Sequence, residues 1–109
     1  MFEASKVAME FVRSIRRIVE IIAEHDPNLA DQQRRASNAT VLNTAEAGRR
    51  VGRDRCNRAR MAAGECDEAV GALHLGEAWG WVTADMLVEP LALADRVLAM
   101  LWRVQHPRR

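Results

Sequence analysis

The sequence predicts an all-α protein that folds as an antiparallel, up-down four-helix bundle. Ala, Leu, Arg, Val and Glu dominate the composition, whereas Tyr is absent and Phe occurs twice, which favours helices over strands. The three prolines, Pro27, Pro90 and Pro107, leave long stretches uninterrupted. Apolar residues recur along these stretches at intervals of three and four, the spacing of one helix face.

The length and the hydropathy indicate one globular domain over residues 1–109. Hydrophobic residues make up 49% of the chain and charged residues 28%, a balance typical of globular proteins. No apolar run approaches the ~18 residues that a membrane span needs, and the N-terminus lacks the apolar core of a signal peptide. We therefore expect a cytoplasmic, bacterial-type protein with reduced thiols and no membrane partner.

The first helix is predicted over residues 4–25. Its apolar positions follow one another at spacings of four, four, three and four, in the order Val7, Phe11, Ile15, Ile18 and Ile22. Asp26-Pro27 ends it, because proline disfavours helical geometry in the residue before it.

The second helix is predicted to begin after Asn28 as the N-cap and to end at Ala47, with Gly48 as the C-cap. Its expected buried face is made of small residues and two larger aliphatic ones: Ala36, Ala39, Val41, Leu42 and Ala45. Residues 49–53 are expected to form a short loop.

The third helix is predicted over residues 53–79, with Gly80 as its C-cap. Its inward stripe contains both cysteines and comprises Cys56, Ala59, Ala63, Cys66, Val70 and Leu73.

The last helix is expected to start with Thr83 as its cap and to bury Leu87, Leu91, Ala94, Leu98 and Leu101. Pro90 either kinks this helix or lies in its first turn, and we favour a continuous, kinked helix. The short loops make successive helices antiparallel neighbours.

Charge is distributed unevenly along the chain, although the formal net charge is only +1. Residues 34–60 contain eight arginines against two acidic residues, a net charge of +6, whereas the segments before and after carry −2 and −3. The candidate nucleic-acid-binding residues are Arg49, Arg50, Arg53, Arg55, Arg58 and Arg60. Guanidinium groups bind phosphates in a bidentate manner, so this cluster favours RNA or DNA. The alternative is a solvated face whose arginines pair with acidic neighbours.

Several polar residues have a structural interpretation. Arg34 and Arg35 are candidates for inward partners of Glu46 or Glu68. Asn43 and Glu46 share a helix face, and we favour a buried hydrogen-bonded pair over a binding site. Asp54 is interpreted as an acid in the first turn of a helix rather than as a general base.

The aromatic and sulfur-containing residues also allow two interpretations. Trp79, Trp81 and Trp102 are able to stack on bases, but packing in the core or in a subunit interface is favoured. Cys56 and Cys66 are expected to be small core residues, the alternative being a reactive thiol beside Arg55.

No motif of an enzyme or of a cofactor site is recognisable. A glycine-rich phosphate loop, a zinc-binding spacing and a nucleophile elbow are absent, and no Glu-x-x-His occurs. We therefore expect neither catalytic residues, nor a metal, nor another cofactor.

Several short motifs resemble those of the family called four helix bundle proteins. They are Leu-Ala-Asp-Gln-Gln-Arg-Arg-Ala at 29–36, Asn-Thr-Ala-Glu at 43–46, Arg-Asp at 53–54, Ala-Ala-Gly at 62–64 with Glu68, and Trp-Gly-Trp-Val-Thr at 79–83. The family includes proteins encoded in intervening sequences of 23S ribosomal RNA genes and accessory proteins of diversity-generating retroelements.

The resemblance implies a homopentamer around a central axis, no catalysis and a role with nucleic acid. For the retroelement branch it implies binding to a reverse transcriptase and its RNA. Independently, the apolar content of the first and last helices exceeds what one small bundle needs, which favours an oligomer. The leading hypothesis is thus an oligomeric accessory protein that binds RNA or DNA. The alternative is a scaffold that docks an acidic protein or a reverse transcriptase.

Overall fold

The computed structural model describes residues 2–108, which form five helices and no strand. These are α1 (Glu3–Ser14), α2 (Arg16–His25), α3 (Pro27–Arg49), α4 (Gly52–Ala78) and α5 (Ala84–Gln105). The predicted all-α class is confirmed. The expected count of four helices differs by one, because the stretch predicted as a single first helix is divided into α1 and α2.

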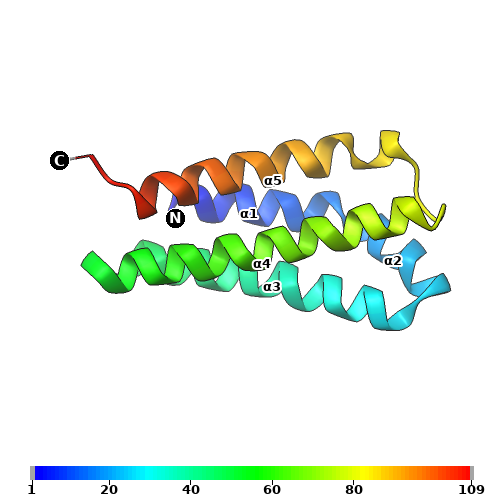
Figure 1. Ribbon diagram of the computed structural model, residues 1–109, viewed down its shortest axis with the longest axis horizontal. Helices are drawn as coiled ribbons and strands as arrows, with labels where there is room; N and C mark the ends of the chain where they lie inside the picture. Colours follow the sequence, from blue (N-terminus) through cyan, green and yellow to red (C-terminus); the bar gives the residue numbers. More distant parts are fainter. Residues whose placement is uncertain (1, 109) are drawn as a thin grey trace.

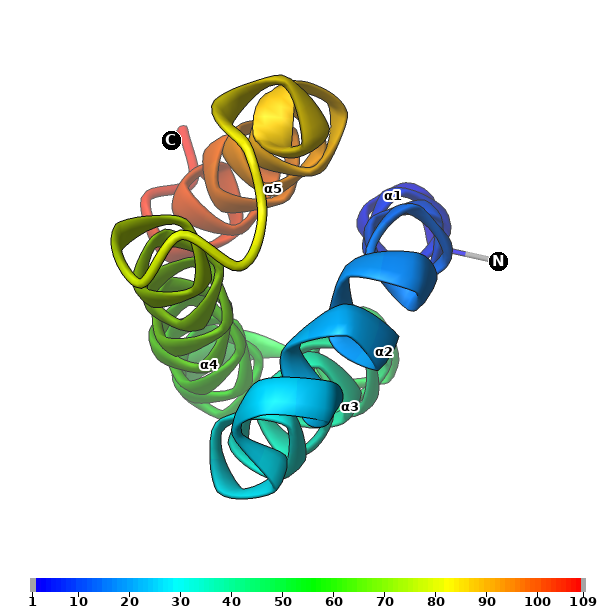
Figure 2. The same ribbon diagram turned by 90° about the vertical axis from the view of Figure 1, so that its right-hand side faces the viewer.

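The helices lie side by side in an elongated bundle, 46 Å in its longest dimension. α3 packs along α4, α4 along α5, and α5 along α1, while α1 and α2 together cover α3 (Figures 1 and 2). The start of α1 and the end of α5 lie at the same end of the bundle as the α3–α4 connection. The connections α2–α3 and α4–α5 lie at the opposite end, which faces the viewer in Figure 2.

The first helix is broken at Ile15, whose backbone (φ −103°, ψ 1°) is not α-helical. The Ser14 hydroxyl donates a hydrogen bond of 2.6 Å to the Phe11 carbonyl, the group that the Ile15 N–H bonds in a regular helix. The Ile15 N–H bonds the Val12 carbonyl instead, at 3.2 Å. Ser14 thereby competes with the backbone, and α2 departs from the line of α1 toward α3 (Figure 2).

The start of α3 differs from the prediction by two residues. Asp26, and not Asn28, is the N-cap, because its carboxylate accepts a hydrogen bond of 3.0 Å from the Leu29 N–H. Pro27 then occupies the first position of the helix, where its missing N–H is not needed.

The buried face of α3 is also different from the predicted one. Ala36 is buried, as predicted, but Leu42 is 66% exposed and Val41 is only half-buried, so the larger residues of the expected stripe lie toward the surface. The face in contact with the core consists of small and polar residues, namely Ala30, Gln33, Ala36, Ser37, Thr40, Thr44 and Ala47. The Thr40 and Thr44 hydroxyls are satisfied locally, by hydrogen bonds of 2.8 and 2.6 Å to the carbonyls four residues earlier.

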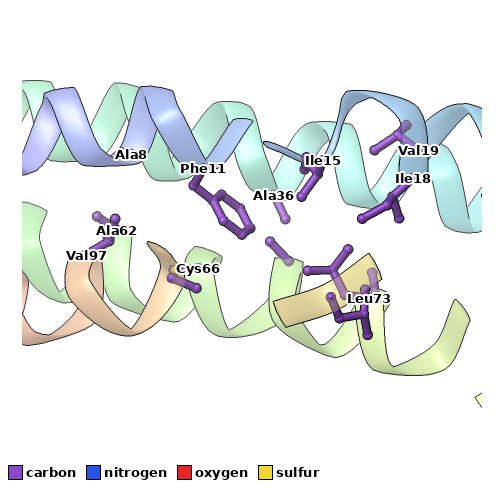
Figure 3. Close-up of a cluster of buried hydrophobic side chains, with 14 of the residues drawn as sticks. Ala8, Phe11, Ile15, Ile18, Val19, Ala36, Ala62, Cys66, Leu73 and Val97 are labelled. Carbon is purple, nitrogen blue, oxygen red and sulfur yellow. The ribbon is translucent and has the colours of Figure 1, made fainter. Parts of the chain in front are cut away.

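α4 presents an equally small surface to the interior. Its buried residues are Ala59, Ala62, Cys66, Ala69, Ala72, Leu73 and Gly76. Because the distance between packed helices depends on the side chains at their contact, these small faces let α3 and α4 approach closely. The large core side chains come chiefly from α1, α2 and α5. Phe11 of α1 points toward the helices that carry Ala36 and Cys66 (Figure 3).

The two cysteines lie in different surroundings. Cys66 is fully buried, and burial raises the pKa of its thiol to about 12, with smaller contributions from Asp67 and Asp95. It is therefore a protonated core residue, as predicted. Cys56 is half-buried, and its Sγ lies 3.6 Å from the Val104 carbonyl oxygen.

Gly48 is not the C-cap of its helix, contrary to the prediction, since α3 continues through it to Arg49. A Cβ atom at this position would lie 2.8 Å from the Phe2 ring, so glycine is required by the close approach of Phe2. Arg50 and Val51 alone connect α3 to α4, a shorter connection than the predicted loop.

The end of α4 follows the prediction. Gly80 has a positive φ of 83°, and the N–H groups of Gly80 and Trp81 bond the carbonyls of Glu77 and Gly76 at 2.8 and 3.0 Å. This pair of bonds is the Schellman motif, which favours glycine because other residues are strained at positive φ.

The last helix is continuous from Ala84 to Gln105, with Pro90 buried within it. Thr83 caps it, as predicted, by accepting a hydrogen bond of 3.4 Å from the Met86 N–H.

We predict that Gly80→Ala lowers the free energy of unfolding by about 1–2 kcal/mol, because alanine is strained in this left-handed conformation. Urea unfolding followed by circular dichroism measures the change. Gly71→Ala is the matched control, since Gly71 lies inside α4 with open space around it. There alanine is expected to stabilise by about 0.5–1 kcal/mol. Equal effects of the two substitutions would contradict the role assigned to Gly80.

Candidate nucleic-acid interface

The antiparallel hairpin of α3 and α4 gathers the predicted arginines at one end of the bundle. Arg49 and Arg50 lie where α3 ends, and Arg53, Arg55, Arg58 and Arg60 lie in the first turns of α4. We call this end, shown at the left of Figure 1, the arginine end. Its positive charge arises because the two-residue connection places the end of α3, which carries Arg49, next to the first turns of α4, which carry four arginines.

Two of the six arginines are engaged in ion pairs. Arg49 contacts Glu46 at 2.5 Å, and Arg50 bridges Glu46 at 3.0 Å and Asp54 at 3.2 Å. The hydrogen bonds from Arg49 and then Arg50 hold the pKa of Glu46 below its usual value. Glu46 in turn raises the pKa of Arg50, with Asp54 adding to the effect. This small network joins the end of α3 to the first turn of α4, where Asp54 lies as predicted.

The other four arginines form no ion pair with any residue from 2 to 108. Arg53 is exposed, and Arg60 donates only to the neutral Asn57 side chain, at 3.1 Å. Arg58 is half-buried and lies 3.5 Å from the Asn43 Oδ1. Arg55 lies over the Phe2 ring, 5.3 Å from its centroid. Neutral neighbours thus orient three of these guanidinium groups and leave their charge uncompensated.

Arg103 belongs to the same end but lies outside the predicted cluster. It lines a surface groove of about 370 Å³ together with Phe2, Arg55 and Met100, and Glu3 is the acidic residue of the same lining. Arg103 is 43 positions beyond the end of the cluster in sequence, and only the antiparallel return of α5 brings it next to α4. In the sequence, the only local sign of a role for Arg103 is that it is a basic residue in the last turn of its helix, where it faces the negative end of the helix dipole.

Arg34 and Arg35 are not inward partners of Glu46 or Glu68. Both are exposed, and Arg35 pairs with Asp31 on its own helix at 2.7 Å. Glu68 is exposed as well and lines a shallow groove with Arg35. The spacing of four between Asp31 and Arg35 forms a local pair on the surface, which makes an inward orientation unnecessary.

Asn43 and Glu46 do not form the predicted buried pair. The Asn43 amide donates to the Ala39 carbonyl at 3.0 Å and accepts from Arg58, whereas Glu46 faces Arg49 and Arg50. Both residues are half-buried at the contact of α3 with the start of α4. They orient arginines instead of pairing with each other.

The tryptophans lie at opposite ends of the molecule and do not fill the core. Trp79 is 68% exposed and Trp102 58% exposed, while Trp81 is partly buried against the core. Trp102 stacks on His106, with 4.2 Å between the ring centroids. The prediction of core packing is therefore wrong for Trp79 and Trp102, and packing in a subunit interface stays a prediction.

Two further findings concern residues 2–108 alone. Within this range no three His, Cys, Asp or Glu residues are grouped so as to hold a metal ion. None of the described helices has the length and apolar character needed to cross a membrane.

The comparisons with known proteins agree with the all-helical fold. The fold is similar to the crystal structure of a protein of unknown function from the S23 ribosomal protein family of Bacteroides thetaiotaomicron. The TM-score is 0.82 at 17% sequence identity, and the alignment covers 94% of this chain and 97% of the other. No curated protein matches the chain. Residues 2–103 match the family described as 23S rRNA-intervening sequence protein. The chain thus belongs to the family of 23S rRNA-intervening sequence proteins, as its motifs predicted.

Proposed function

We propose that this protein is a non-enzymatic accessory factor of nucleic-acid processing, a four-helix bundle in which α1 and α2 together make one member. In this proposal it assembles into a homopentamer and binds RNA or DNA through the arginine end without strong sequence specificity. The observation that carries the proposal is a group of four arginines at one end of the molecule that form no ion pair with any of the described residues 2–108.

The number of guanidinium groups at the arginine end, and the contacts that hold them in place, are compatible with phosphate binding. Long cationic side chains lose conformational freedom on binding, and contacts that hold them beforehand reduce this loss. Phe2, Asn43 and Asn57 hold Arg55, Arg58 and Arg60 without neutralising them. The Arg103 guanidinium adds a further charge beside Arg55. A phosphate backbone that follows this end would meet charges from α4 and α5 together.

The oligomer in this proposal is supported by an exposed apolar surface between α1 and α3. The groove there has a volume of about 480 Å³. Its lining includes Phe2, Met9, Val41, Leu42 and Ala45. Leu42 lies within it although it is among the most exposed aliphatic side chains of the described chain. Contiguous apolar surface of this kind is typical of protein interfaces. In a pentamer the arginine end would occur five times, which would multiply its charge.

We predict that the wild-type protein binds labelled structured RNA and duplex DNA with an affinity that falls steeply with salt. Arg53→Glu/Arg60→Glu should reduce the salt dependence for duplex DNA by a slope of about 1.8, corresponding to two lost phosphate contacts. Fluorescence anisotropy across a salt series measures both quantities. These arginines are chosen because they form no ion pair within residues 2–108, so the fold should remain intact.

The control variant is Arg16→Glu/Arg34→Glu, which makes the same change in net charge beside a groove away from the arginine end. It should retain most of the affinity. An equal loss in both variants would show that only net charge matters and would contradict a localised site. If neither nucleic acid binds at low salt, the nucleic-acid proposal fails, and the arginine end becomes a candidate for docking an acidic protein or a reverse transcriptase.

A second prediction concerns assembly. At micromolar concentration, analytical ultracentrifugation should give a mass five times that of the 12.2 kDa chain. Leu42→Asp should shift this mass to that of the monomer, because the charge would be buried in the contact. Val88→Asp is the control, since Val88 is equally exposed (67%) but lies on α5. A monomeric wild type, or a Leu42→Asp oligomer of unchanged mass, would contradict the proposed interface.

A further inference from the structure

Three aromatic rings are stacked at the end of the bundle opposite the arginine end. Trp81 stacks on His25, with 5.2 Å between the centroids and 3° between the planes. It also stacks on Trp79, at 5.9 Å and 14°. We call this group, made of His25, Trp79 and Trp81, the aromatic end.

The stack is held in a fixed position by the backbone. Gly80 reverses the chain at the end of α4 through the Schellman bonds, so that Trp81 comes back onto the core while Trp79 stays on the surface. His25 is contributed by the last turn of α2. Three rings from two elements therefore form one platform, and its most exposed member, Trp79, is 68% accessible.

The residues around this platform are predominantly acidic. Residues 20–31 and 74–89, which make up this end, contain seven acidic residues and neither Lys nor Arg. Glu20 pairs with Arg17 and Asp31 with Arg35, and the Asp26 carboxylate caps α3. Glu24, Glu77 and Asp85 form no ion pair within residues 2–108, whereas Glu89 lines a groove with Arg13 of α1. Phosphate groups would be repelled here, so a nucleic acid does not suit this platform.

We propose that the aromatic end is a second binding surface, which docks an arginine-rich segment of a partner protein. The negative face of an indole ring attracts a guanidinium group placed over it, and Arg stacks on such rings better than Lys. Neighbouring carboxylates provide bidentate partners for further arginines of the same segment. Exposed aromatic rings next to carboxylates without an ion pair within residues 2–108 are suited to bind an arginine-rich segment. Neither the rings alone nor the carboxylates alone would favour arginine as the ligand.

The two ends of the molecule then serve different partners. The arginine end binds polyanions, and the aromatic end binds a polycationic polypeptide. This surface is independent of the proposed nucleic-acid interface, since the two lie at opposite ends of the bundle and share no residue.

A labelled oligo-arginine peptide tests the surface directly by fluorescence anisotropy at low salt. The wild type should bind it, and oligo-lysine of the same length should bind more weakly. Trp79→Ala should weaken the binding of oligo-arginine roughly fivefold, the size of a cation–π contact at an exposed site. Glu24→Gln/Asp85→Asn should weaken it further and reduce its salt dependence.

Trp102→Ala is the matched control, because Trp102 is a similarly exposed tryptophan, stacked on His106, on the last helix. It should leave the affinity for oligo-arginine unchanged. Equal losses in the two tryptophan variants, or no binding by the wild type, would overturn the proposal. It would also be overturned if Trp79→Ala weakened RNA binding, which would make the rings a platform for bases. Dissociation of the oligomer by Trp79→Ala, with no peptide bound by the wild type, would assign the surface to a second copy instead.

Discussion

The close packing of α3 on α4 is the constraint on which the rest of the structure depends. Both helices bury mainly small residues, which allows their backbones to approach closely, and only Arg50 and Val51 connect them. Thr40 and Thr44 lie on the buried face of α3, and their hydroxyls bond carbonyls of their own helix, so they need no partner from another helix. The larger side chains that complete the core come from the other helices. Phe11 of α1 and Leu101 of α5 are among the largest of the fully buried side chains.

The separation of charge between the two ends follows from this hairpin. A basic segment in the middle of the chain becomes one end of the molecule because the chain reverses within it. The ion pairs of Glu46 and Asp54 with Arg49 and Arg50 stabilise the reversal itself. The arginines beyond it are oriented by neutral groups and keep their charge. The reversals at the other end bring together acidic residues and three aromatic rings, so one topology creates two surfaces of opposite character.

Much of this could be predicted from local patterns, and the errors have physical causes. The stripe Val7–Ile22, the Gly80 cap and the Thr83 cap depend on neighbouring residues, and all three are observed. The buried face of α3 could not be found from apolar periodicity, because Gln33, Thr40 and Thr44 are inside while Leu42 is outside. Likewise, Gly48 resembles a cap in sequence, but it is required by the Phe2 ring, 46 positions earlier. Arg103 and the ring stack depend on contacts between distant segments, which spacing alone does not reveal.

We propose that nucleic acid binds at the arginine end of the molecule and is excluded from the aromatic end. Photocrosslinking of the wild-type protein to labelled structured RNA, with the crosslinked peptides identified by mass spectrometry, tests this most directly. If RNA binds at the arginine end, we expect crosslinks within residues 49–60 and around Arg103, and none to peptides that contain His25, Trp79 or Trp81. Crosslinks concentrated at the aromatic end, or spread evenly along the bundle, would contradict it.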